Sequence, residues 1–251
     1  MRIRAPQADI KMGKNIISQR RGRGTTTYRA HSFRWLADIK HRRLDDHEKN
    51  SSIKGQIIDL LHSKGHSAPL ALIKYSNNEL GYIFAPELIK VGEEIESGIK
   101  ARIKVGNTLP LSNIPNGTSI YNIEVNPGDG GKLCRASGTS AIVISNSENE
   151  VMVELPSRKQ KKFNPSCRAT IGIIAGKGKL DKPWVKAGKK HHAMRARGKL
   201  YPRTSGVAMN AVDHPFGSGR GRKHTKKKSM SEFAPPGRKV GPVRARRTGR
   251  K

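Results

Sequence analysis

The residues with the clearest chemical potential lie in one glycine-rich stretch of the C-terminal third. Residues 206–221 read GVAMNAVDHPFGSGRG, so a carboxylate, an imidazole and an aromatic ring fall together at Asp213, His214 and Phe216. A backbone so rich in glycine neither holds a helix nor fills a central strand. We therefore expect a loop that lies close against a polyanion and directs a few side chains at one spot.

Two interpretations of Asp213 and His214 follow from their residue types. As an acid–base pair they would make the chain an RNA-processing enzyme, although neighbours in sequence seldom face each other and no nucleophile stands out. As structural residues, Asp213 would accept backbone N–H bonds within the loop, and His214 would donate a hydrogen bond to RNA. The structural interpretation is preferred, and the enzyme stays as the alternative.

Nucleotide and metal motifs are incomplete elsewhere in the chain. GDGGK at residues 128–132 lacks the P-loop spacing, and residues 217–221 lack the dinucleotide fingerprint. His191 and His192 are adjacent, so on a helix they point about 100° apart, and no acidic residue lies nearby to complete a metal site. No cofactor is expected, and Mg²⁺ is expected only through bound RNA.

The cysteine content and the N-terminal sequence indicate the cellular compartment of the protein. Cys134 and Cys167 form no Cys-x-x-Cys pair, so a zinc site has little support. No apolar segment follows the first basic residues, as a secretory signal would require. Two free thiols in a reducing, cytoplasmic environment are therefore expected.

The charge of the chain is large and unevenly distributed. The formal net charge is +31 and the isoelectric point is near 10.7. Residues 1–43 carry a net charge of +10, residues 44–175 of +1 and residues 176–251 of +20. A nearly neutral centre between two basic arms predicts a polyanionic partner. Nucleic acid is favoured over a membrane surface, because the chain has no apolar run of 18 residues and no long basic amphipathic helix.

The neutral centre must be the folded scaffold that positions the arms. It contains short apolar runs separated by turn residues, and the alternation of IKARIKV at 99–105 is that of a strand with one wet face. Short strands with frequent turns predict an all-β fold of small barrels, joined near residues 86–92. The expected strands are 53–61, 70–75, 80–85, 99–105, 119–125, 141–145, 151–155 and 169–174.

The two arms lack a strand pattern. In the N-terminal arm, basic residues interleaved with Tyr28, Phe33 and Trp35 suit phosphate contact and stacking on unpaired bases. A disordered, solvated arm is the alternative. The C-terminal arm, which also holds Trp184, has one candidate helix at 189–195 after Gly188 and is otherwise expected to become ordered only on its partner.

Several segments, read in order, resemble one protein family over nearly the full length of the chain. The family is the large-subunit ribosomal protein two family, the universal L-two family, in its archaeal form. The segments that carry the resemblance are QRRGRG (19–24), YRA (28–30), GNTLPL (106–111), PGDGGK (127–132), RASG (135–138), CRATIG (167–172), HH (191–192) with RARG (195–198), GVAMNAVDHP (206–215) and APPGRKVG (234–241).

The resemblance implies an all-β architecture of an OB-fold barrel at 44–88 followed by an SH3-like barrel at 89–175. Basic extensions lacking regular structure would occupy residues 1–43 and 176–251. It implies a structural constituent of the large ribosomal subunit, not an enzyme, that binds large-subunit rRNA and supports assembly, subunit association and the RNA around the peptidyl transferase centre. Other expected partners are the small subunit across the intersubunit face and other large-subunit proteins, with no membrane.

The residues expected to bind rRNA are mostly cationic and lie in the two arms. Asp213 and His214 would lie near the peptidyl transferase centre. The full set is Arg20, Arg21, Arg23, Arg29, Lys177, Lys179, Lys189, Lys190, His191, His192, Arg195, Arg197, Asn210, Asp213, His214, Arg220, Arg222, Lys223, Arg238 and Lys239.

Four positions depart from the family pattern. Phe216 stands where bacterial members have a second histidine, and Ser205 stands where arginine is usual. Ser218 interrupts a glycine run, and Arg158 replaces the usual glycine after the Leu-Pro-Ser turn. A free nucleic-acid chaperone or nucleoid protein is the remaining alternative, and it predicts similar affinity for DNA and RNA duplexes.

Overall fold

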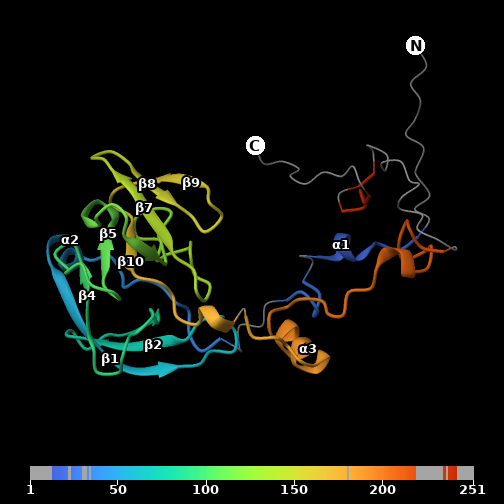
Figure 1. Ribbon diagram of the computed structural model, residues 1–251, viewed down its shortest axis with the longest axis horizontal. Coiled ribbons are helices and arrows are strands. Elements are labelled where there is room, and N and C mark those ends of the chain that lie inside the picture. The colour runs from blue at the N-terminus through green and yellow to red at the C-terminus, as the bar shows by residue number, and fades with distance from the viewer. Residues whose placement is uncertain are drawn as a thin grey trace, which may run out of the picture. The chain divides into compact units, whose positions relative to one another are not determined.

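The computed structural model describes residues 13–21, 24–29, 33, 35–179, 181–218, 234–235 and 237–241. The chain divides into two compact units. One is His31–Val185, and the other combines Met1–Ala30 with Lys186–Lys251. Figure 1 labels most strands of the first unit, together with α1 and α3 of the second.

A ten-stranded sheet forms the first unit, in the order β3-β2-β1-β4-β5-β10-β6-β7-β8-β9. Neighbouring strands are antiparallel except β4 and β5, which meet in parallel at Ser97 and Thr108. The structure is therefore mainly β with few helices, as predicted. The elements of this unit are α2 (Asp46–Asn50), β1 (Ser52–Leu61), β2 (Leu70–Tyr75), β3 (Leu80–Phe84), β4 (Glu94–Gly98), β5 (Thr108–Pro110), η2 (Leu111–Asn113), β6 (Ser119–Tyr121), β7 (Ala141–Asn146), β8 (Val151–Glu154), β9 (Gln160–Phe163), β10 (Arg168–Ile171) and η3 (Lys177–Lys179).

Apolar side chains gather in separate clusters along this sheet. One lies among β1–β4 and includes Ile57 and Ile73. A larger one lies among β5–β10. Phe84 and Tyr121 pack in a third cluster, where the Tyr121 hydroxyl donates to the Phe84 carbonyl oxygen at 3.0 Å. Burial raises the pKa of Tyr121, so this hydroxyl stays a donor.

Segment 99–105 is not a strand, contrary to the prediction. Its alternating pattern belongs to a loop in which Ile99, Ile103 and Val105 remain partly exposed. The Asn107 side chain holds this loop, because its oxygen accepts from the Glu96 N–H at 2.8 Å and its Nδ2 donates to the Arg102 carbonyl at 2.9 Å. A side-chain clamp of this kind competes with strand pairing.

The sequence pattern did not predict three of the strands, namely β4, β5 and β9. Their sequences EIESG, TLP and QKKF carry too few apolar residues or are too short for a periodic signal. Two predicted strands also end early, at Tyr121 and at Ile171, because the next residues, Asn122 and Gly172, have φ of 50° and 117°. Long-range pairing, rather than local composition, decides these elements.

The pairing of β4 concerns the predicted boundary between the OB-fold barrel and the SH3-like barrel, which is expected between residues 88 and 89. β4 lies after that division and pairs with β1 over Ser52–Gln56. The division itself stays a prediction.

A buried ionic network fastens α2 and the residues before it to β10. Arg168 donates from Nη2 to the Glu124 carboxylate at 2.8 Å, from Nη1 to Glu48, and from Nη1 to the Arg42 carbonyl at 2.7 Å. The Glu48 and Glu124 side chains are fully buried. Burial opposes ionisation of Glu124, but the hydrogen bonds and charge of Arg168 outweigh it and hold the pKa of Glu124 below its usual value. Burial raises the pKa of Glu48, against the opposing effect of Arg168.

His41 anchors the same segment to the second half of the sheet. Its backbone N–H donates to the Gly130 carbonyl at 3.0 Å, and its ring Nε2 lies 2.6 Å from the Asn122 carbonyl oxygen. Since that oxygen can only accept, the ring carries its proton on Nε2. Burial, together with the charge of Arg168, lowers the pKa of His41 to about 4, so the ring is neutral at pH 7.

Candidate nucleic-acid interface

The candidate interface begins with α3 (Ala187–Ala196), which confirms the predicted short helix of the C-terminal arm. Its sequence AGKKHHAMRA holds no acidic residue, and Lys189 and Arg195 are exposed. The Lys190 ammonium lies 5.3 Å from the centre of the Tyr201 ring, a cation–π contact that holds one end of the side chain. The helix therefore presents positive charge to solvent without internal neutralisation.

His191 and His192 lie on this helix with their ring centres 5.3 Å apart, nearly edge to face. Both are exposed. Within the described part of the chain, no group of three or more His, Cys, Asp or Glu side chains could hold a metal ion. Cys134 and Cys167 are both free thiols, as expected.

The glycine-rich stretch is a closed loop held by its own backbone. It opens with the 3₁₀ turn η4 (Gly206–Ala208). The Asn210 carbonyl then accepts from the N–H groups of Asp213 and His214 at 3.0 and 3.1 Å, and the Ser218 N–H donates back to the Met209 carbonyl at 3.1 Å. These bonds make residues 209–218 a compact double turn, whose shape does not depend on a helix or strand.

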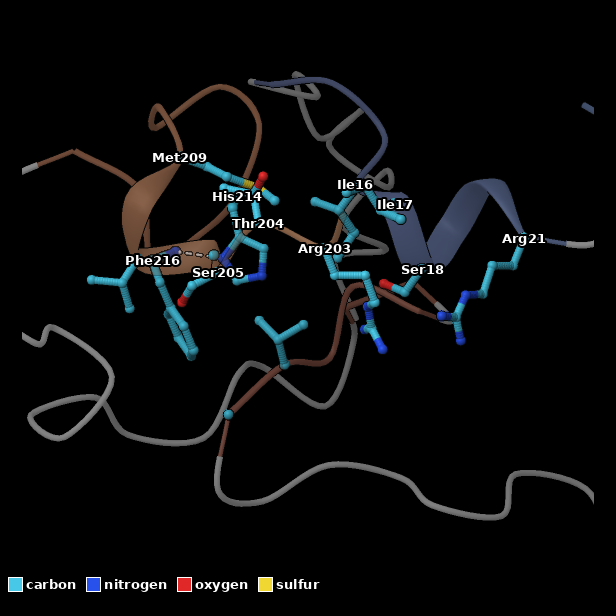
Figure 2. Close-up of a pocket in the computed structure, with 14 residues that line it drawn as sticks. Ile16, Ile17, Ser18, Arg21, Arg203, Thr204, Ser205, Met209, His214 and Phe216 are labelled. Carbon is cyan, nitrogen blue, oxygen red and sulfur yellow. Dashed lines mark hydrogen bonds between the residues drawn. The ribbon is translucent and has the colours of Figure 1, made fainter. Parts of the chain in front are cut away.

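His214 is fixed within this loop. Its Nδ1 accepts from the Phe216 N–H at 3.0 Å, and its ring meets the Phe216 ring edge to face at 5.1 Å (Figure 2). A neutral ring with Nδ1 as acceptor carries its proton on Nε2. The imidazole lies so close to Gly206 that an added Cβ would stand 2.3 Å from His214 Cε1. Gly206 is therefore required for this position of the ring.

A second glycine of the loop makes an equally close approach. A Cβ on Gly217 would stand 2.1 Å from the Asn210 carbonyl oxygen, which is a backbone atom and cannot swing aside. Glycine at 206 and 217 thus has a steric reason in each case.

Asp213 makes a different contact from the one expected. Its carboxylate Oδ1 lies 4.0 Å from the Lys14 ammonium, while the Lys14 N–H donates to the Val212 carbonyl at 3.1 Å. The turn itself closes on the Asn210 carbonyl. A carboxylate paired with Lys14, beside an imidazole whose Nδ1 accepts a backbone N–H, is the arrangement of a structural turn and not of an oriented acid–base pair.

Residues 13–21 of the N-terminal arm lie against the loop within the same unit. α1 (Ile17–Arg20) leaves Arg20 and Arg21 exposed, and the Arg21 guanidinium lies 5.8 Å from the Tyr28 ring centre. The Ser18 hydroxyl donates to the Gly237 carbonyl at 2.6 Å, which joins the arm to residues 237–241. A cavity of about 660 Å³ opens between these segments and the loop, and Figure 2 shows Arg21, Arg203 and His214 around it.

The remaining predicted RNA-binding residues are distributed over both units. Arg29, Arg197 and Asn210 are exposed in the unit that combines residues 1–30 with residues 186–251, where Arg238 and Lys239 are half-buried. Lys177 and Lys179 instead belong to the unit of the sheet, where Lys179 Nζ donates to the Ser67 carbonyl at 3.1 Å. Arg23, Arg220, Arg222 and Lys223 lie outside the described residues.

The aromatic residues proposed for base stacking differ in their surroundings. Phe33 is 78% exposed, whereas Trp35 packs over Gly65 and lies 5.9 Å from the His66 ring centre. Trp184 is 40% exposed. Phe33 thus presents most of its surface, and one side of Trp35 is already covered.

Sequence reasoning missed Lys14 and Arg203 as parts of this site. Lys14 pairs with Asp213, and Arg203 lines the cavity beside His214. Arg203 could have been found, since it stands three residues before Gly206. The partner of Asp213 could not, because Lys14 is remote in sequence.

No helix in the described part of the chain is long and apolar enough to cross a membrane.

Comparison with known proteins gives two family matches. Residues 10–97 match "Ribosomal Proteins L2, RNA binding N-terminal domain", and residues 104–234 match "Ribosomal Proteins L2, C-terminal domain".

Individual relatives named "Large ribosomal subunit protein uL2" match along nearly the whole chain. The Methanothermobacter thermautotrophicus protein is 53% identical over 240 residues, covering 96% of this chain and 100% of the relative. The Methanococcus vannielii protein is 52% identical, with coverage of 96% and 100%. The Haloarcula marismortui protein is 51% identical, with coverage of 95% and 98%. Both domains are matched, and about half of the aligned positions are identical. The chain therefore belongs, in an archaeal form, to the uL2 family of RNA-binding proteins of the large ribosomal subunit.

Proposed function

We propose that this large-subunit protein acts by shape, holding folded rRNA near the peptidyl transferase centre on the loop 206–218. The observation that carries the proposal is the fixed position of His214, set by the Phe216 N–H and by close approach to Gly206. A rigid, glycine-based loop lets a backbone approach RNA closely, while α3 and the N-terminal arm supply cations for phosphates. Catalysis in this proposal belongs to the RNA.

The proposal extends to the predicted rRNA-binding residues as a set. The exposed cations of the arms would neutralise phosphates, and Mg²⁺ would enter only with the RNA. Contacts with the small subunit across the intersubunit face, contacts with other large-subunit proteins, and a role in assembly are part of the same proposal.

The finer architecture is also proposed, as an OB-fold barrel followed by an SH3-like barrel. Separate apolar clusters among β1–β4 and among β5–β10 support two barrels. The pairing of β4 with β1 supports a first barrel that continues past residue 88.

The test compares His214→Ala with wild type in large subunits that carry the tagged protein. We expect both proteins to co-sediment with the large subunit after a salt wash, and we expect His214→Ala to change the chemical reactivity of nucleotides around the peptidyl transferase centre. His62→Ala, at an exposed histidine of the other unit, is the matched control and should leave that reactivity unchanged. Identical reactivity in wild type and His214→Ala would overturn the proposed role of the loop.

A further inference from the structure

The cavity beside His214 is built by three segments of the unit that combines residues 1–30 with residues 186–251. Residues 16–21, 203–216 and 240–241 contribute its walls, and its volume is about 660 Å³. Pockets of roughly 300–1,000 Å³ receive compact organic ligands. The cavity is therefore large enough for a single nucleotide unit.

The lining is apolar inside and cationic at one side. Ile16, Val207, Met209, Phe216 and Val240 form apolar wall. Among the described residues that line the cavity, Arg21 and Arg203 are the charged ones, and none is an aspartate or glutamate. Both arginines are exposed, and Figure 2 shows them among the residues drawn around the cavity. A fitting occupant is flat, largely apolar over its faces and anionic at one end.

His214 adds a directional polar group to this wall. Its Nδ1 accepts the Phe216 N–H, so the neutral ring has its proton on Nε2. The adjacent Phe216 ring stands edge to face with it at 5.1 Å. A donor next to an aromatic ring suits a nucleobase, which offers lone pairs at its edge and a π face.

We propose that this cavity receives one unpaired nucleotide of the bound rRNA. The base packs against Phe216, Val207 and Met209 within reach of His214, and its phosphate lies at Arg21 and Arg203. The inference rests on the proposed function, since it specifies what the loop 206–218 holds. In the proposed function the loop is a surface that follows the RNA backbone. The inference adds that the loop also binds one base that is turned out of its stack.

The decisive variant fills the cavity without changing charge. Val240→Trp places an indole where the nucleotide would lie, and Val212→Trp makes the same exchange in the loop at a valine that is 52% exposed and outside the lining. Each protein is expressed in cells, and its large subunits are purified by sedimentation and probed for nucleotide reactivity. We expect one nucleotide, or two neighbours, to gain reactivity in Val240→Trp subunits and none in Val212→Trp subunits.

Arg203→Gln is the second variant, and it removes a rim charge without adding volume. It should raise the reactivity of the same nucleotide, and it decides the question if Val240→Trp fails to enter subunits. Unchanged reactivity in both variants, with normal sedimentation, would overturn the nucleotide inference and leave the proposed function standing. Wild-type protein that stayed at the top of the gradient would overturn the proposed function instead.

A binding measurement on the free, full-length chain provides an independent readout. With single-stranded adenine hexanucleotide RNA as the probe, Val240→Trp should weaken binding about ten-fold or more, which corresponds to about 1.4 kcal/mol. Val212→Trp should remain within about two-fold of wild type. Equal weakening by the two tryptophans would count against the cavity as the site.

Discussion

At the scale of single residues, Arg158 and Ser218 occupy left-handed backbone positions, with φ of 60° and 61°. Both stand where the family resemblance leads one to expect glycine. Glycine adopts this conformation without steric cost, whereas other residues are strained there by roughly 1–2 kcal/mol. The departures in sequence thus coincide with local backbone strain.

Arg158→Gly is therefore expected to stabilise the protein by about 1 kcal/mol, the strain relieved less the added flexibility of the unfolded chain. The measurement is the free energy of unfolding from a urea titration of the free chain. Lys159→Gly, one residue further in the same turn and without positive φ, is the matched control and should lose stability. A loss in both variants would contradict the strain argument.

Gly206→Ala should displace the His214 ring without unfolding the loop. The new Cβ would overlap atoms at the end of the His214 side chain, which can rotate away. Because the ring would leave its place 5.1 Å from Phe216, the NMR shifts of the His214 ring protons should change. Gly188→Ala, where a Cβ meets nothing within 4 Å, should leave those shifts unaltered.

At the scale of elements, Arg168 joins β10 to α2 and to the segment before it. It is 3% exposed and compensates two fully buried carboxylates. Removing one partner of a buried ion pair leaves an uncompensated charge in a medium of low dielectric constant. The side chain thus holds together elements that are distant in sequence.

Arg168→Met is expected to lower the free energy of unfolding by about 3–5 kcal/mol. Adding Glu124→Gln should recover part of that loss, because one buried charge is then gone. The control is Lys162→Met, which removes an exposed partner of Glu150 and should change stability by no more than about 0.5 kcal/mol. Chemical denaturation at pH 7 gives all three values, and no recovery in the double variant would contradict the charge argument.

His41 makes the attachment of residues 39–45 sensitive to pH. Its pKa in the folded state is about 4, below the ordinary value of 6.5, so the unfolded chain binds a proton first as pH falls. The stability contributed by the neutral ring is present above pH 6.5 and is lost as pH falls toward 4. Between pH 7 and 5 the loss should be about 2 kcal/mol.

The measurement for His41 is the difference in unfolding free energy between these two pH values. His41→Gln, which retains a donor for the Asn122 carbonyl, should reduce that difference by about 2 kcal/mol. His62→Gln, at an exposed histidine, should retain it. An undiminished difference in His41→Gln would place the pH dependence elsewhere.

At the scale of the whole molecule, charge separates the scaffold from the arms. Residues 44–175 are nearly neutral, whereas residues 1–43 and 176–251 hold almost all of the net charge. Several cations of the sheet unit are already paired with carboxylates, as in Lys49–Asp46, Lys104–Glu93 and Lys162–Glu150. The cations of α3 have no acidic neighbour on that helix.

Affinity for rRNA should therefore depend on salt through the arms. Changing Lys189, Lys190 and Arg195 together to Gln should reduce the slope of log K against log salt by about 2–3. The matched control changes Lys49, Lys104 and Lys162 to Gln, which removes the same charge from paired positions and should alter the slope by less than about 1. Equal effects in the two triple variants would mean that net charge alone governs binding.

The sequence alone determined the features that depend on composition and on local periodicity. The basic arms, the mainly β centre, the helix at α3 and the family could all be read from residues near one another in the chain. Turn residues and apolar runs act locally, so strands such as β2 and β8 were predicted close to their observed limits.

Only the tertiary structure decided the features that depend on contacts between distant residues. β4 and β9 exist because β1 and β8 pair with them, although their own sequences carry little strand signal. The Asn107 side chain turned an alternating segment into a loop, and Lys14 reached Asp213 from the other end of the chain. Hydrogen bonds, ion pairs and close glycine contacts depend on which residues are neighbours in space. The order of residues predicts these contacts only where neighbours in space are also neighbours in the chain.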